Sequence, residues 1–365
     1  MNDLLVIFEN VPDPRDINAR HDLGEMLFIA LLAMMCGAES CVEMALFANQ
    51  KAQMLRRVLA LEHGIPSHDT FSRVFQRLDP AALEAAFENF MRAFAQTLAQ
   101  TGARVLSVDG KCVKRAYEKG KPHMPPMMVS VWGAALRMTL AQTQAGAGGE
   151  AEAALDLIKR VSLKGAVLTA DALHCHKNMA AAVKAGGGDY VLALKTNQPR
   201  LHRQALALIE AKAPHAPFAE TRDEAHGRIE TRRAIVVGAQ ALGAELAFPG
   251  LKAIARMTRR RQVNGKVSEE HRLYALSRKS TPRAAMEIIR AHWDIENGSH
   301  WKQDVILHED YSRTRKDNGP RNLALIRRLT ANILTSIPDK ASMKSKRLKA
   351  AWTEDYMFNA LTHMR

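Results

Sequence analysis

Apolar residues recur at helical spacing at the start of the chain and give way to short apolar runs after about residue 100. An apolar run covers 23–36, and a second helical pattern covers roughly 40–60. Ser67 or Asp69 can cap the next helix, and Asp79-Pro80 starts another. We therefore predict that residues 1–98 are all helical, as a simple bundle or as a unit containing a helix-turn-helix.

From residue 104 the apolar runs have the length of buried strands and alternate with helical patterns. Strands are predicted over 104–110, 127–135, 137–144, 165–172 and 189–195, and helices over 152–161, 178–185 and 199–213. Three consecutive strands followed by helical crossovers describe an α/β sheet. Its chemistry is expected at the strand ends.

A β-rich stretch at 215–280 interrupts this alternation. The segments RIETRRAIVV, GLKAIARMTRR and EHRLYALS read as antiparallel strands, with a turn at VNGK. A helix over 282–296 follows, and then a tail at 313–349 with eleven Lys and Arg. The predicted organisation is a helical segment (1–98), a first core part (99–214), an insertion (215–280) and a core completion with basic C-terminal helices (281–365).

Charge and cysteine content narrow the partners and the compartment. The net charge of +14 favours a polyanionic partner such as nucleic acid, and a basic surface without a partner is the alternative. The four cysteines form no C-x-x-C pair and indicate free thiols, and the adjacent His174, Cys175 and His176 are a weak metal candidate. The apolar run 26–36 is too short to span a bilayer and no signal peptide is evident, so we expect a cytoplasmic protein without a membrane partner.

Three carboxylates stand out as candidates for chemistry. Asp109 and Asp171 each end a predicted strand, and Glu296 falls on a helical face with Ile289 and Trp293. Clustered carboxylates repel one another, and a hard cation such as Mg²⁺ relieves that repulsion. The alternative is local: Asp109-Gly as turn chemistry, Asp171 as a helix cap, and Glu296 satisfying nearby donors.

Seven segments then resemble, in order, the H-repeat-associated family of bacterial insertion-sequence transposases. They are GIPSHDTFSRVFQRLDP, SVDGK, LTADALHCHK, DYVLALKTNQ, HGRIETR, HWDIENGSHWKQDV and EDYSRTR. The resemblance runs from about residue 13 to 357. It implies an RNase H-like mixed sheet with a β-rich insertion before the glutamate, and Asp109, Asp171 and Glu296 as the catalytic, metal-binding triad.

The resemblance further implies an Asp-Asp-Glu DNA transposase that cleaves at the ends of its element and joins them to target DNA. Two Mg²⁺ ions, with Mn²⁺ as a substitute, would serve as cofactors. Double-stranded DNA would be the partner, with a homodimer as one arrangement of the DNA complex and residues 1–98 recognising the element ends. The alternatives are a catalytically weakened or silent DNA-binding descendant and a metal-dependent nuclease that does not join ends.

The family pattern also implies DNA contacts at ten positions. They are Lys111, Lys195, Asn197, Gln198, Arg228, Arg232, His292, Lys302, Arg313 and Arg315. Lys111 is expected near the scissile phosphate, where it would help to keep Asp109 ionised. The alternative for each position is a solvated basic surface. Trp293 and Trp301 are more typical of core residues than of base-stacking platforms.

The sequence departs from the family pattern around the expected site. The usual Lys-Ser-Asn-Glu-Ile segment is replaced by AGAGGEAEAA (145–154), which lacks the lysine and the asparagine. His176 stands where glutamine is usual, and Met127 where histidine is common. These changes favour the weakened or domesticated alternative, whereas the presence of all three carboxylates favours activity.

Overall fold

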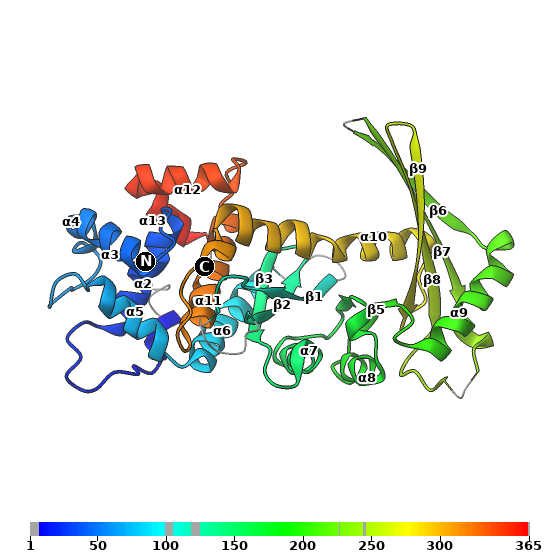
Figure 1. The fold of residues 1–365 in the computed structure, drawn as a ribbon, viewed down its shortest axis with the longest axis horizontal. Helices are drawn as coiled ribbons and strands as arrows, with labels where there is room; N and C mark the ends of the chain where they lie inside the picture. Colours follow the sequence, from blue (N-terminus) through cyan, green and yellow to red (C-terminus); the bar gives the residue numbers. More distant parts are fainter. Residues whose placement is uncertain (1–6, 99–104, 118–124, 226, 244–245, 364–365) are drawn as a thin grey trace.

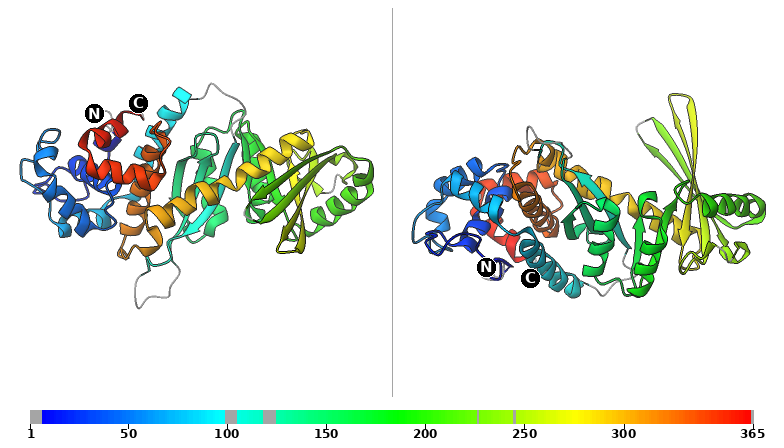
Figure 2. Two further views of the ribbon diagram at one scale, coloured as in Figure 1. Left: turned by 90° about the horizontal axis from the view of Figure 1, so that it is seen from above. Right: turned by 60° about the horizontal axis from the view of Figure 1, so that its bottom comes forward.

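The computed structural model describes residues 7–98, 105–117, 125–225, 227–243 and 246–363 and shows an elongated molecule (Figure 1). Helices from both ends of the chain gather at one end of it, and long antiparallel strands stand at the other. A sheet lies between them, as both views in Figure 2 also show. The chain is thus a mixed α/β protein with a helical N-terminal region.

Most of the N-terminal helices begin at a side chain that accepts a hydrogen bond from a backbone N–H, whereas the short helix at 52–55 has no such cap. They are α2 (Leu23–Met35), α3 (Cys41–Gln50), α4 (Ala52–Leu55), α5 (His68–Arg77) and α6 (Pro80–Leu98). The helix expected over 40–60 is therefore two helices. Ser67, rather than Asp69, caps α5 by accepting a hydrogen bond from the backbone N–H of Thr70. Nearly all of α2 is buried, yet no helix within the described ranges has the length and apolarity to cross a membrane.

These helices share one core with the C-terminal helices α11 (Gly319–Ser336), α12 (Met343–Trp352) and α13 (Glu354–Thr362). Asn322 is buried in α11 and its side-chain amide donates to the carbonyls of Phe75 and Leu78, each at 2.9 Å. Arg321 pairs with the buried Glu84 of α6 at 2.7 Å. The N-terminal helices consequently do not have a core of their own, because their buried side chains pack with those of α11, α12 and α13.

The segment 313–349 contains α11 and the start of α12, and part of its charge lies inside the protein. Arg327 and Arg328 are 2% and 1% exposed, and Lys346 is 7% exposed. The ammonium of Lys346 donates to two backbone carbonyls, and Arg328 forms an ion pair with Glu309. The count of basic residues therefore overstates the basic surface, because long side chains can bury their aliphatic stems and find partners for their charged ends.

One mixed sheet of nine strands runs through the described residues in the order β3-β2-β1-β4-β5-β9-β8-β7-β6. The strands are β1 (Val105–Cys112), β2 (Met127–Gly133), β3 (Met138–Gln144), β4 (Val167–Ala170), β5 (Asp189–Leu194), β6 (Phe218–Ala225), β7 (Arg228–Gly238), β8 (Ala253–Val263) and β9 (Lys266–Leu276). Strand β1 is antiparallel to β2 and parallel to β4, and β5 is parallel to β4. The insertion extends the core sheet, since β9 pairs antiparallel with β5. Its edge strand β6 was not predicted.

Helices cover both faces of the core sheet. On one face α7 (Gly149–Arg160) and α8 (Lys177–Ala185) pack in a cluster with the inward side chains of β1 and β4. On the opposite face α10 (Pro282–His292) packs in a cluster that includes Val167 of β4. Because side chains alternate along a strand, β1 directs Asp109 and Lys111 away from the α7 and α8 cluster, which holds Val108.

The shared core predicts the effect of removing the first 98 residues. A chain that begins at residue 99 should lose its cooperative unfolding transition and aggregate, because the buried face of α11 would be exposed. Circular dichroism during urea unfolding and sedimentation velocity would measure this. A soluble remainder with a cooperative transition would instead show that residues 1–98 form a separate unit.

Candidate active site

Two neighbouring parallel strands bring the candidate aspartates to one edge of the sheet. Asp109 lies in β1 and Asp171 directly follows β4, and the register pairs Val108 with Ala170. Glu296 arrives from the segment after α10, and all three side chains line one cavity of about 610 Å³. Folding thus brings together the three carboxylates that the sequence singled out.

Glu296 is an exposed carboxylate without a local partner. Within the part of the chain that the structure describes, its side chain accepts no hydrogen bond and forms no ion pair. The expectation that it lies on the apolar face of a continuous helix is wrong, because α10 ends at His292 and the backbone then winds differently. The alternative that it satisfies nearby donors finds no such donor among the described residues.

The segment that carries Glu296 is π-helical. It comprises η5 (Ile295–His300) and η6 (Lys302–Ile306). Wider π turns are uncommon and occur frequently at functional sites. Gly298 lets this segment approach the sheet closely, because a Cβ at that position would lie 2.9 Å from the Trp132 ring. The glycine therefore allows this segment to lie close against β2, the neighbour of β1 in the sheet.

Asp171 combines a capping role with a position in the cavity. Its Oδ1 accepts a hydrogen bond of 2.9 Å from the backbone N–H of Leu173 and caps the short helix η1 (Ala172–His174). The capping alternative is therefore confirmed. The side chain is nonetheless 51% exposed and borders the same cavity as Asp109, so the cap also orients this carboxylate.

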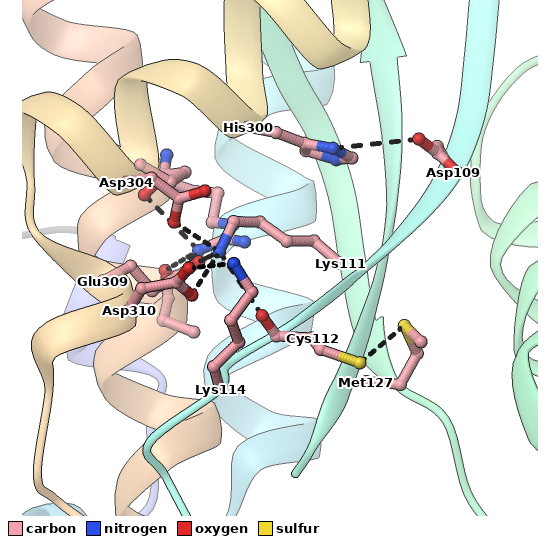
Figure 3. A network of polar contacts seen from close by, with 12 residues as sticks. Asp109, Lys111, Cys112, Lys114, Met127, His300, Asp304, Glu309 and Asp310 are labelled. Atoms are coloured by element: carbon pink, nitrogen blue, oxygen red, sulfur yellow. Dashed lines mark hydrogen bonds and ion pairs between the residues drawn. The ribbon is translucent and has the colours of Figure 1, made fainter.

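Asp109 is an electrostatically costly carboxylate. Burial, and after it repulsion from Glu150, Asp171 and Glu296, raises the pKa of Asp109 to about 7, although the Gly110 N–H donates to its Oδ1 at 2.9 Å. The Nδ1 of His300 lies 3.8 Å from the other oxygen (Figure 3). Because burial lowers the pKa of His300 to about 4, this ring is neutral near pH 7 and supplies no compensating charge.

Glu150 is a fourth carboxylate that the sequence analysis missed. It lies in the first turn of α7, and its Oε1 is 3.2 Å from Nε2 of the buried His174. Gly110 makes room for it, because a Cβ there would lie 2.5 Å from the Glu150 carboxyl carbon. The sequence signal that could have found Glu150 is the acidic turn directly after the two glycines of AGAGGEAEAA. That segment was noted above only because it lacks a lysine and an asparagine.

The two residues that follow His174 in the HCH sequence have structural roles. His176 caps α8 by accepting from the Met179 N–H at 3.1 Å, and Cys175 is buried in the core. No three His, Cys, Asp or Glu side chains in the described ranges are already converged on a single ion position. The site offers instead several uncompensated carboxylate oxygens around one cavity, which is the donor chemistry that a hard divalent cation requires.

Three positions expected to contact DNA follow β5 in the chain, and one of them, Lys195, borders the cavity. Lys195 is exposed and lines the cavity. The Asn197 amide donates to the carbonyl of Ala172 at 2.5 Å, so it ties this loop to the residue after Asp171. Gln198 precedes α9 (Pro199–Lys212) without a side-chain cap.

Four further positions expected to contact DNA lie in the insertion and in the loop before α11. Arg228 and Arg232 lie on β7, both pair with Glu230, and both line a second cavity of about 710 Å³ beside α10. Arg313 is exposed, and the guanidinium of Arg315 lies 4.7 Å from the Tyr117 ring centroid. These four positions stay predictions as DNA contacts.

His292 and Lys302, expected to bind a phosphate, each have a polar contact with a hydroxyl group of the protein. Nδ1 of His292 lies 3.2 Å from the Thr169 hydroxyl, and burial lowers the His292 pKa to about 4, so the ring is neutral near pH 7. Lys302 donates to the Thr335 hydroxyl at 3.2 Å, and burial lowers its pKa to about 8. His292 also lines the cavity with Asp109, Asp171 and Glu296, and both positions stay predictions as phosphate contacts.

The two tryptophans of the segment differ in their surroundings. Trp293 is half-buried beneath the guanidinium of Arg272, at 4.6 Å from the ring centroid. Trp301 is 52% exposed, so the expectation that it is a core residue is wrong. The turn to π geometry accounts for this, since it changes which residues face the sheet.

Lys111 does not neutralise Asp109. Its ammonium lies 2.7 Å from Asp304, 3.1 Å from Glu309 and 3.2 Å from Asp310 (Figure 3). The expectation that it keeps Asp109 ionised is contradicted, because its ammonium pairs with these three other acids and the pKa of Asp109 is raised to about 7. The lysine instead joins β1 to the residues after η5.

Comparison with known proteins defines the class. Residues 100–333 match the family model described as the transposase DDE domain, and residues 5–91 match a model described as DDE_Tnp_1-associated. The chain belongs to the DDE transposase family.

Its relatives include named members of the H-repeat group. The chain is 38% identical over 285 residues to an uncharacterized protein in the dhlA 3′ region of Xanthobacter autotrophicus, covering 75% of this chain and 94% of that protein. It is 31% identical to the putative transposase YncI of Escherichia coli O157:H7, covering 98% and 94%. It is 28% identical to the H repeat-associated putative transposase YhhI of Escherichia coli K12, covering 96% and 95%. The resemblance to this group is thereby confirmed.

The raised pKa of Asp109 predicts how stability depends on pH without metal. The folded chain holds this proton more tightly than the unfolded chain, whose carboxyl has a pKa near 3.8, so stability should fall as pH rises from about 4 to about 7. Asp109→Asn should lack this part of the pH dependence. Urea midpoints in chelator, compared with those of Asp69→Asn on the surface of α5, would measure it. Parallel pH profiles for wild type and Asp109→Asn would contradict the assignment.

Proposed function

We propose that this protein is a DNA transposase that cleaves at the ends of its own insertion sequence and joins them to target DNA. In this proposal Asp109, Asp171 and Glu296 together hold two Mg²⁺ ions, which Mn²⁺ can replace. The observation that carries it is the Glu296 carboxylate, which has no partner among the described residues and lines one cavity with the two aspartates. The cost falls on the buried Asp109, which Asp171 and Glu296 repel, and a bound cation would relieve that repulsion.

The sheet supports an RNase H-like core. The order β3-β2-β1-β4-β5, with β1 antiparallel to β2 and parallel to β4, agrees with that fold. The insertion β6–β9 lies between β5 and the segment with Glu296. This arrangement matches the family resemblance on which the triad was assigned.

The chain's own groups prepare the site for phosphoryl transfer. When bound, two divalent ions would activate the attacking oxygen and stabilise the leaving one. Asp109 would release its proton as the ions bind, because a nearby positive charge lowers a carboxyl pKa. The Leu173 N–H holds Asp171 in place, and Gly298 sets how closely the segment with Glu296 approaches the sheet.

The substrate in this proposal is double-stranded DNA. The net charge of +14 favours a polyanion, and Lys195 and Arg272 line the cavity with the carboxylates. The long strands β7–β9 project past the core (Figure 1) and carry further arginines of the second cavity. Phosphates of a duplex entering the cavity would meet these cations.

Glu296→Gln is the direct test of the triad. The substitution keeps the shape of the side chain and removes its charge, so we expect cleavage of DNA carrying the element's terminal repeats to be abolished. DNA affinity should persist or rise, because a negative charge near phosphate is removed. Unfolding free energy should change by less than about 0.5 kcal/mol, since the exposed carboxylate has no described partner.

The matched control is Asp294→Asn, the same loss of charge two residues away, which should leave cleavage unchanged. Retained cleavage by Glu296→Gln would refute the assignment. Cleavage by wild type without joined products would indicate a nuclease, and binding without cleavage a silent DNA-binding protein.

Binding itself should depend strongly on salt. If the basic surfaces neutralise about six to ten phosphates, affinity should fall about 10³–10⁵-fold between about 50 and 200 mM salt. Fluorescence anisotropy with a terminal-repeat duplex would measure the slope. A nearly flat response would exclude DNA as the partner.

A further inference from the structure

A buried ion-pair cluster ties the strand of Asp109 to the segment of Glu296. Lys111 is 8% exposed and lies two residues after Asp109, on the same face of β1. Its three carboxylate partners lie in η6 and in the short helix η7 (Glu309–Tyr311), which follow Glu296 along the chain (Figure 3). The cluster therefore spans the two parts of the site that must be held at a fixed distance.

The cluster is built into the core. Glu309 is 0% exposed and pairs both with Lys111 and with Arg328 of α11, which is 1% exposed. Asp310 has a second cation in Lys114, at 2.7 Å. In the described ranges Asp304 pairs with Lys111 alone. Loss of Lys111 would thus leave the other two acids with a cation each and Asp304 with none.

Asp304 is the member closest to Glu296 in the chain. It lies in η6, eight residues after Glu296, and His300 between them faces Asp109. The π-helical segment accordingly contacts β1 at two places: His300 lies opposite Asp109, and Asp304 pairs with Lys111. The first contact spans 3.8 Å, whereas the Lys111 ammonium and the Asp304 carboxylate form an ion pair at 2.7 Å, so the second contact is the stronger tie.

We propose that Lys111 is a positioning residue that acts through Asp304 to set the spacing between the Asp109 and Glu296 carboxylates. It contacts no DNA in this proposal, which replaces the phosphate contact expected from the sequence. The inference rests on the proposed function for its activity readout. Its second readout, stabilisation of the protein by metal, needs neither DNA nor turnover.

Lys111→Met and Asp304→Asn should each weaken metal binding. The Mg²⁺ concentration for half-maximal cleavage should rise about 10–100-fold, the usual cost of losing a group that orients metal ligands. The Mn²⁺ concentration needed to raise the melting temperature of the DNA-free protein should increase in parallel. The double variant should be little worse than either single variant, because both remove the same contact.

The matched control is Lys114→Met, which removes the same charge from Asp310 while leaving Asp304 paired. It should keep the metal midpoints of wild type. Lys111→Arg retains the charge and should recover part of the loss. Since Asp304 is one-third exposed, Asp304→Asn keeps the test usable if Lys111→Met does not fold.

The outcomes separate the competing roles. Unchanged metal midpoints in Asp304→Asn would overturn the proposal. A DNA-contacting lysine would instead lower affinity and reduce the salt slope by about one in Lys111→Met, with Asp304→Asn normal, which would also overturn it. If wild type cleaves no DNA, the proposed function fails, and the Mn²⁺ melting shift alone decides the positioning role.

Discussion

Repulsion among carboxylates that the fold holds around one partly buried cavity is the constraint on which the arrangement depends. Asp109, Asp171, Glu150 and Glu296 come from four separate elements, and their mutual repulsion adds to burial in raising the pKa of Asp109. Such a site opposes its own assembly. Rigid supports hold it together: parallel pairing of β1 with β4, a backbone cap on Asp171, and buried packing beneath the π-helical segment.

The charged residues that support the site differ from those of the site itself in whether their charges are paired. Asp109, Asp171 and Glu296 line the open cavity and pair with no lysine or arginine among the described residues. Each acid of η6 and η7 that contacts Lys111 is paired with a cation: Asp304 with Lys111, Glu309 also with the buried Arg328, and Asp310 also with the exposed Lys114. Both sets are connected through β1, which carries Asp109 and Lys111 on one face. The unpaired charges are available to a ligand, and the paired charges fix geometry. This division explains why a lysine next to a candidate catalytic aspartate faces other acids.

Local signals in the sequence predicted the elements but not their partners. The strand that leads directly into Asp171, the cap at Ser67 and the Asn-Gly turn at 264–265 follow from short-range chemistry, and the structure has them. The prediction that the first strand ends at Asp109-Gly110 is wrong, because β1 continues to Cys112. Glu150 was missed because the sequence of the first turn of a helix does not indicate which strand that turn will pack against. The burial of Arg327 and Arg328, and the exposure of Trp301, depend on packing between distant segments, which residue type alone does not encode.

The shared core of the two chain ends has a consequence for synthesis. The apolar helix α2 ends at residue 35 and packs against α11, which begins at residue 319. At about 5–20 residues per second, a ribosome needs roughly 15–60 s to make the intervening chain. During that time the apolar surface of α2 lacks its α11 partner and depends on nearby helices or chaperones for cover. Premature termination anywhere before α11 would leave a product destined for aggregation or degradation, so incomplete copies of this protein should not accumulate as folded competitors on DNA.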